Sequence, residues 1–206
     1  MEDKFKNRYR IPSNRLRGWN YARNGHYFIT IVTYGREHRF GEIVDGQMVL
    51  NEIGKIVYDE FFKSVEIREE LFLGEFVLMP NHLHAIVILD KNGCEPDENR
   101  IMVETHGRAS LPGRASLPGR ASLPHREPQS ISSFVAGFKS AAINKIDDWM
   151  DENNRSMKKF NKTNPLWQAN YHDHIIRNEQ EYIRISEYIV HNPENWEEDT
   201  LKSDNQ

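Results

Sequence analysis

The pattern of apolar and polar positions predicts two strongly apolar strands. His26 to Tyr34 is β-branched and aromatic, as expected of a strand. Glu75 to Leu89 is a second apolar, β-branched run and contains His82 and His84. Because a strand alternates its faces with a period of two, both histidines point to one face, and Leu83 points the other way, towards a core.

Three further segments show the helical spacing of apolar residues, and each follows a residue type that favours the N-cap position. The expected caps are Asn51, Ser132 or Ser133, and Asn178. The first helix is expected over about residues 51–64 and the second up to Met150. The third should end near His191, because Pro193 restricts the residue before it and has no amide to donate.

Weaker strand predictions complete a sheet. Either Val65–Ile67 or Leu71–Leu73 lies before the histidine strand, and Trp167–Arg177 supplies the last strand. Asp45-Gly46 predicts a hairpin ahead of the first helix. The order β, α, β, β, α, β with a terminal helix is that of the ferredoxin-like (RRM-like) α+β fold, an antiparallel sheet with one face for helices and one for a ligand. We expect a single domain over residues 1–206.

Residues 91–130 differ in kind from the rest of the chain. They contain GRASLP three times in tandem, over Gly107 to Pro112, Gly113 to Pro118 and Gly119 to Pro124. Glycine and proline in every copy prevent a regular helix or a strand ladder. We expect a flexible insertion, and a solubilising spacer is favoured over contact of its arginines with nucleic acid.

The charge distribution indicates a contact with a polyanion, although the whole chain has a net charge of −4. Residues 1–40 hold nine Lys or Arg residues against three acids, whereas the C-terminal end is acidic. Within residues 8–24, arginines alternate with Tyr9, Trp19 and Tyr21, a pattern suited to phosphates and unpaired bases. A solvated, partly disordered tail explains the charge about as well.

The bulk composition excludes several classes of protein. No apolar run approaches the roughly 20 residues that span a bilayer, and the N-terminus lacks the apolar core of a secretion signal. The single cysteine, Cys94, rules out an intrachain disulfide. These features predict a cytoplasmic protein with no membrane partner.

Two pairs of residues are candidates for chemistry. His82 and His84 on one strand face are candidate metal ligands, although strand histidines are more often structural. Tyr188 and Asn192 lie four residues apart, so a phenol and a carboxamide share an approach to the same cation. The phenol needs such a cation to become a nucleophile. Taken alone, a core tyrosine and a C-terminal cap explain this second pair better.

A second histidine pair, His172 and His174, has the same i, i+2 spacing. It could form a second metal site, or provide a general base and phosphate contacts. We favour a supporting role for His174, because Asp173 would face the opposite side and no apolar strand precedes the pair. Tyr171 and Tyr182 are reserve candidates for the nucleophile.

Together these motifs resemble those of the REP-associated tyrosine transposases, a branch of the HUH single-tyrosine transposases with an IS200-like domain. Met79-Pro80-Asn81-His82-Leu83-His84 resembles the HUH signature, in which a hydrophobic residue separates two histidines. The matching flanks are Tyr9-Arg10, the Gly25 to Thr33 strand, Phe138-Lys139-Ser140, Trp167-Gln168, Asp173 to Asn178, and Tyr188 to Pro193. The resemblance runs from about residue 8 to 198, and the GRASLP insertion departs from the family pattern.

The resemblance implies a metal-dependent nuclease and strand transferase that cleaves and rejoins single-stranded DNA beside hairpins. His82, His84 and Asn192 would hold one divalent cation, Mg²⁺ or Mn²⁺, that polarises the scissile phosphate. Tyr188 would attack and leave a 5′-phosphotyrosine and a free 3′-hydroxyl. The residues expected to contact DNA are Arg8, Arg10, Arg15, Arg17, Lys139 and Arg177.

The same resemblance implies a bacterial protein, monomeric or homodimeric, that is associated with the nucleoid when bound to DNA. Two other classes remain open. One is a domesticated hairpin DNA- or RNA-binding protein without cleavage, and the other is a metal-dependent phosphohydrolase that uses both histidine pairs. Neither explains a tyrosine and a carboxamide one helical turn apart.

Overall fold

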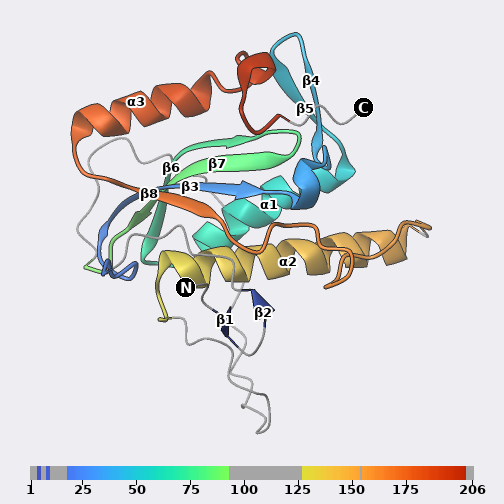
Figure 1. The fold of residues 1–206 in the computed structure, drawn as a ribbon, viewed down its shortest axis with the longest axis horizontal. Helices are drawn as coiled ribbons and strands as arrows, with labels where there is room; N and C mark the ends of the chain where they lie inside the picture. Colours follow the sequence, from blue (N-terminus) through green and yellow to red (C-terminus); the bar gives the residue numbers. More distant parts are fainter. Residues whose placement is uncertain (1–3, 6–7, 10–17, 93–126, 154, 203–206) are drawn as a thin grey trace, which may run out of the picture.

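The computed structural model describes residues 4–5, 8–9, 18–92, 127–153 and 155–202. Within them, an antiparallel sheet of four strands in the order β6-β7-β3-β8 forms the centre of the molecule (Figure 1). Its strands are β3 (Gly25–Val32), β6 (Leu71–Leu78), β7 (His82–Leu89) and β8 (His172–Ile176). Two short hairpins lie outside it, β1 (Lys4–Phe5) with β2 (Arg8–Tyr9) and β4 (Gly41–Val44) with β5 (Gln47–Leu50).

The helices lie on both sides of this sheet. They are α1 (Glu52–Glu66), α2 (Ile131–Glu152) and α3 (Glu179–Val190), with short 3₁₀ turns η1 (Tyr34–Arg36) and η2 (Trp196–Glu198). Helices α1 and α2 cover one face, and α3 lies over the opposite face (Figure 1). The α+β fold predicted from the sequence is confirmed, and its strand order is that of the ferredoxin-like arrangement.

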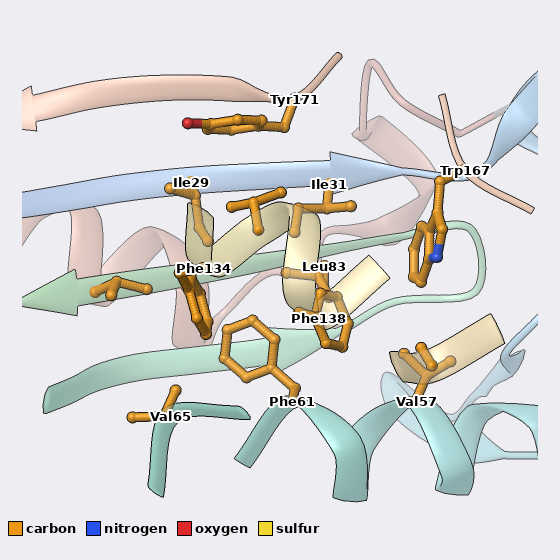
Figure 2. Close-up of a cluster of buried hydrophobic side chains, with 14 of the residues drawn as sticks. Ile29, Ile31, Val57, Phe61, Val65, Leu83, Phe134, Phe138, Trp167 and Tyr171 are labelled. Carbon is orange, nitrogen blue, oxygen red and sulfur yellow. The ribbon is translucent and has the colours of Figure 1, made fainter. Parts of the chain in front are cut away.

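The main core lies between the sheet and helices α1 and α2. Phe61 of α1 packs edge-on against Phe134 and Phe138 of α2, with ring centroids 5.6 Å and 5.1 Å apart. Figure 2 shows these rings beneath Ile31 and Leu83 of the sheet. Burying such side chains stabilises the fold by about 1.5–3 kcal/mol each, so this core is a major source of the stability of the sheet.

A smaller apolar cluster attaches α3 to the other face. Ile185 and Ile189, one helical turn apart, pack with Ile86 of β7 and Ile176 of β8. Because Ile86 has the same strand parity as His82 and His84, this cluster places α3 over the face that carries both histidines.

The capping predictions are confirmed at two helices and wrong at the third. Asn51 Oδ1 accepts from the amide of Gly54 at 2.9 Å, and Asn178 caps α3 in the same way. The cap of α2 is Ser130, which exchanges hydrogen bonds with Ser133 in a capping box. Helix α2 therefore begins with Ile131, whose burial adds an apolar position that the predicted boundary left out.

The strand boundaries also differ from the prediction. Glu75 to Leu89 is not one strand but the end of β6 and all of β7, separated by a turn at Pro80. Proline at this position interrupts the ladder of an otherwise continuous apolar run. Val65–Ile67 belongs to the end of α1, so Leu71–Leu73 is the correct alternative for the preceding strand. The last strand covers only His172–Ile176 of the predicted Trp167–Arg177.

Some of the sequence-based predictions concern residues that the structure does not describe. Residues 10–17 of the basic arm (8–24) and residues 93–126 of the insertion (91–130) lie outside the described residues. Of the helices that the structure does describe, none has the length and apolar character to cross a membrane.

Candidate metal centre and nucleophile

His82 and His84 lie side by side at the start of β7, on the face beneath α3. Both imidazoles are buried, and their ring centroids are 4.6 Å apart. Leu83 between them is buried in the core formed with α1 and α2, as the alternation predicted. The strand therefore presents two imidazoles to one face and anchors itself through the other.

The side chain of Asn81 fixes the tautomer of His82. Its amide nitrogen donates to the carbonyl oxygens of Arg36 and Leu201, at 3.0 Å and 2.8 Å. Its Oδ1 is then the acceptor for His82 Nδ1, which lies 2.7 Å away. His82 Nε2 consequently carries a lone pair and no proton, which is the form that binds a metal.

His84 is held in a comparable way. Its Nδ1 lies 2.8 Å from Thr30 Oγ1, and its ring stacks on Phe28 with centroids 5.2 Å apart. The Thr30 hydroxyl can donate or accept, and in the tautomer in which it accepts from Nδ1, the His84 Nε2 atom has a free lone pair towards Tyr188. Both histidines thus have a partner at Nδ1 that can orient the ring.

Tyr188 brings a phenol to this pair from helix α3. Its hydroxyl lies 3.2 Å from His84 Nε2, and its ring meets Phe28 edge-on. The residue remains 46% exposed, so a molecule from solvent can contact it. Ile185 and Ile189 hold the helix to the sheet on either side of this turn.

Two further side chains reach the same place from the segment that follows α3. Asn192 is buried, and its Oδ1 has no hydrogen-bond partner in the described structure. Asp199 follows η2, and its Oδ2 lies 3.5 Å from His82 Nε2 and is likewise unpartnered. The amide of Leu201 donates to the other oxygen of Asp199 at 2.6 Å, which orients the carboxylate.

Asp199 is the functional candidate that the sequence analysis missed. It lies in an acidic tail and has no motif spacing to the histidines. Two hydrogen bonds across the fold bring it to His82, one from Asn81 to the carbonyl of Leu201 and one from Arg36 to the carbonyl of Thr200. The position of Asp199 next to His82 is therefore evident from these tertiary contacts and not from the sequence.

The surroundings keep the two imidazoles neutral. Burial lowers the pKa of His82 from 6.5 to about 4, against the opposing effects of the Asp199 charge and of Asn192. Burial and then the neighbouring His82 lower the pKa of His84 well below 6.5. The contact of His82 with Asp199 is therefore not an ion pair at pH 7, because the imidazole is uncharged.

The phenol is also held in its neutral form. Burial raises the pKa of Tyr188 above 10, and the charge of Asp199 raises it further, while a hydrogen bond with Asn192 acts in the opposite direction. Burial and the Asp199 charge outweigh the hydrogen bond with Asn192, so activation of Tyr188 needs additional positive charge.

The donor set fits a divalent cation. His82 Nε2, Asn192 Oδ1 and Asp199 Oδ2 are buried acceptors without donors, an arrangement that costs free energy unless a cation lies between them. His82, His84 and Asp199 offer ligand atoms within 4.8 Å of one another. Ligands at about 2.1 Å from an ion lie at most about 4.2 Å apart, so a small contraction completes the site. Imidazole nitrogens with carboxylate and amide oxygens suit Mn²⁺ and related ions.

The other predicted site residues lie elsewhere. His174 is exposed on β8 and pairs with Glu181 of α3 at 2.7 Å, outside this centre. The ammonium of Lys139 donates to the carbonyl oxygens of Gln168 and Asn170. Arg177 is exposed immediately before α3. The side chain of Arg8, and the whole of Arg10, Arg15 and Arg17, lie outside the described structure.

The two reserve tyrosines are separated from the centre. Tyr171 is buried in the core on the α1 and α2 side of the sheet. Tyr182 lies at the opposite end of α3 and meets the ring of His26 at 5.7 Å. Tyr188 is therefore the predicted nucleophile that the fold brings to the histidines.

Comparison with known proteins finds a relative by sequence and a solved structure with a similar fold. An uncharacterised protein of Haemophilus influenzae is 36% identical over 192 residues, which cover 93% of each chain. A solved structure of a REP-associated tyrosine transposase bound to a REP hairpin has a TM-score of 0.50 at 16% identity, covering 88% of this chain and 74% of that one. No family model matches the chain. At 16% identity, the similarity to the solved transposase structure shows a shared fold and no more.

Proposed function

The chain belongs to the same family as the Haemophilus influenzae protein, and we propose that it is a metal-dependent DNA transposase that cleaves and rejoins single-stranded DNA next to hairpins. One observation carries this proposal. Buried acceptor atoms without donors, on His82, Asn192 and Asp199, lie next to a half-exposed phenol whose oxygen contacts His84. The transposase fold supports the choice of DNA as the substrate.

Each residue of the centre has a distinct role in the proposal. His82, His84 and Asn192 would hold one divalent cation, Mn²⁺ or Mg²⁺, and Asp199, whose carboxylate lies with the two imidazoles, would add a charged oxygen ligand. A cation bound there supplies positive charge beside the scissile phosphate and the phenol oxygen. Asn81 and Thr30 orient the two imidazoles through Nδ1.

Tyr188 is the nucleophile in this proposal. Its oxygen forms a bond to phosphorus, and the bond from phosphorus to the 3′-oxygen breaks. The phenol loses its proton, and the departing 3′-oxygen gains one, so the products are a 5′-phosphotyrosine and a 3′-hydroxyl. The phosphotyrosyl bond retains the energy of the original diester, so the reverse reaction joins the 5′ end to another 3′-hydroxyl without ATP.

The DNA would reach Tyr188 on the solvent side of α3, where the side chain is exposed. The solved transposase of the same fold is bound to a REP hairpin, which supports a hairpin substrate for this chain. Arg177 lies next to the same helix, and we propose that it contacts the DNA backbone together with Arg8, Arg10, Arg15, Arg17 and Lys139. His174 would support that surface through its pair with Glu181.

A covalent-trapping experiment tests this function. The protein is incubated with Mn²⁺ and hairpin DNA that carries single-stranded flanks, and the products are separated under denaturing conditions. We expect a protein–DNA adduct that disappears with chelator and in Tyr188→Phe. Tyr58→Phe, at an exposed tyrosine of α1, is the matched control and should retain it.

Two outcomes would overturn the proposal. Hairpin binding that is equal with and without metal, with no adduct, would favour a binding protein without cleavage. Turnover of a model phosphodiester that is indifferent to Tyr188→Phe would favour a phosphohydrolase.

A further inference from the structure

A hollow of about 400 Å³ lies at the end of α3 that is remote from Tyr188. It is lined by the start of β3, the end of β8 and the first turn of the helix, and includes His26, Arg177, Glu179 and Tyr182. His26 has the same strand parity as Phe28 and Thr30, which contact His84. The hollow therefore opens on the same sheet face as the metal centre.

The wall of this hollow is aromatic. His26 and Tyr182 meet nearly edge-on, with ring centroids 5.7 Å apart and planes at 74°. Burial lowers the pKa of His26, which keeps its ring neutral. Gly74 of β6 leaves room for the Tyr182 hydroxyl, because a Cβ there would lie only 2.7 Å from it. A flat ring at the edge of a hollow large enough for a base, such as that of Tyr182, is suited to stacking an unpaired base.

The charges at this place argue against a phosphate deep in the hollow. Glu179 and Glu181 lie in the first turn of α3, and burial and then the nearby charge of Glu75 raise the pKa of Tyr182. Glu181 already accepts from the amide of Arg177 at 2.9 Å. A carboxylate such as that of Glu179 instead accepts hydrogen bonds from an exocyclic amino group of a base. The exposed guanidinium of Arg177 remains for the adjoining phosphate.

The hollow lies within reach of the cleavage chemistry. Six residues of helix separate Tyr182 from Tyr188, which is about 9 Å along the axis. Four residues of strand separate His26 from Thr30 beside His84, about 13 Å. At about 3.4 Å for each stacked nucleotide, a base in the hollow lies within roughly four nucleotides of the scissile phosphate.

We infer that this hollow is a binding site for one unpaired base that carries an exocyclic amino group, in the single strand next to the cleaved phosphate. Tyr182 stacks on the base, the perpendicular ring of His26 borders the base at its edge, Glu179 accepts from its amino group, and Arg177 binds the adjacent phosphate. The inference rests on the proposed function for the presence of DNA, and it adds a recognition position that the metal centre itself does not provide.

Scanning the DNA with abasic sites tests the inference. The probe is a hairpin with oligo-dC flanks, and binding to Tyr188→Phe protein with Mn²⁺ is measured by fluorescence anisotropy. We expect one position, within about four nucleotides of the cleavage site, where loss of the base weakens binding about 5- to 100-fold. In a background that also carries Tyr182→Leu, the same abasic site should change binding less than about twofold, whereas Tyr58→Leu should leave the profile unchanged.

A change of base at that position tests the contact of Glu179. Replacing dC by dT there should weaken binding about tenfold, and Glu179→Gln should reduce this preference, since an amide can donate to thymine O4 as well. A flat abasic profile with normal adduct formation in the parent protein would refute the base site and leave the proposed function intact. A position-specific profile without adduct formation would refute cleavage and retain the base site. Absence of hairpin binding would refute both.

Discussion

The hydroxyl of Tyr188 lies 3.2 Å from Nε2 of His84, although 104 positions separate the two residues in the chain. A strand buried on both faces supplies the imidazole, and a helix attached by two isoleucines supplies the phenol. The contact places a nucleophile beside a set of unpartnered acceptor atoms.

Replacing Asp199 by asparagine should have opposite effects on metal binding and on stability without metal. The amide could donate to His82 Nε2, so two facing acceptors would become a hydrogen bond worth about 1 kcal/mol. We expect a rise in Tm of about 2–4 °C in chelator. Affinity for Mn²⁺, measured by titration calorimetry, should fall at least about 10-fold. A lower Tm together with unchanged Mn²⁺ affinity would show that Asp199 does not face a cation.

Asn81→Ala should weaken metal binding without removing a ligand. It removes the acceptor that keeps the proton on His82 Nδ1. The proton can then move to Nε2, where it blocks the lone pair that would bind the metal. Loss of such a supporting residue typically costs about 10- to 100-fold in affinity. Asn195→Ala is the control, since Asn195 is exposed and its side chain donates to the carbonyl of His191. Equal Mn²⁺ affinity in both variants would argue against the tautomer argument.

The packing of α3 against the sheet should depend on the absence of a Cβ atom at Gly74. A Cβ there would lie 2.7 Å from the Tyr182 hydroxyl and 3.1 Å from Cβ of Ile86. Gly74→Ala should therefore destabilise the protein by about 1–3 kcal/mol in urea denaturation. Tyr182→Phe removes the closest atom, so the double variant should recover part of the loss. Simple additivity of the two changes would mean that this contact does not limit the packing of α3.

The acid stability of the α3 attachment should depend on Glu181. Its pKa is lowered from 4.5 first by the hydrogen bond from the Arg177 amide and then by that with His174. A carboxyl whose pKa is depressed in the folded state stabilises the protein above its unfolded pKa, and this contribution is lost as the pH falls through the folded value. The Tm difference between the parent protein and Glu181→Gln should thus shrink below pH 4.5. Glu187→Gln, at an exposed position of the same helix, is the matched control.

Most residues of the site could be predicted from the periodicities of strands and helices in the sequence. A period of two placed His82 and His84 on one face and Leu83 in the core, and a spacing of four placed Tyr188 and Asn192 near each other. These relationships are local, so they survive errors in the element boundaries. The same reasoning failed at Glu75 to Leu89, where a short turn splits one apolar run into two strands.

The rest of the centre depends on contacts between distant segments. Asp199 has no sequence spacing to the histidines, and the carbonyl of Leu201 that helps to orient Asn81 is 120 positions away from it. Any residue has a backbone carbonyl, so a sequence motif cannot predict which carbonyl accepts the hydrogen bond from Asn81. The hollow beside Tyr182 is also formed by three elements at once.

Peptide mapping of the trapped adduct tests the central claim most directly. After incubation with Mn²⁺ and hairpin DNA, the complex is digested with nuclease and protease, and the modified peptide is identified by mass spectrometry. The account predicts a nucleotide attached through phosphate to Tyr188, formed only with divalent metal. A nucleotide on Tyr182 or Tyr171, or an adduct that forms equally in chelator, would contradict it.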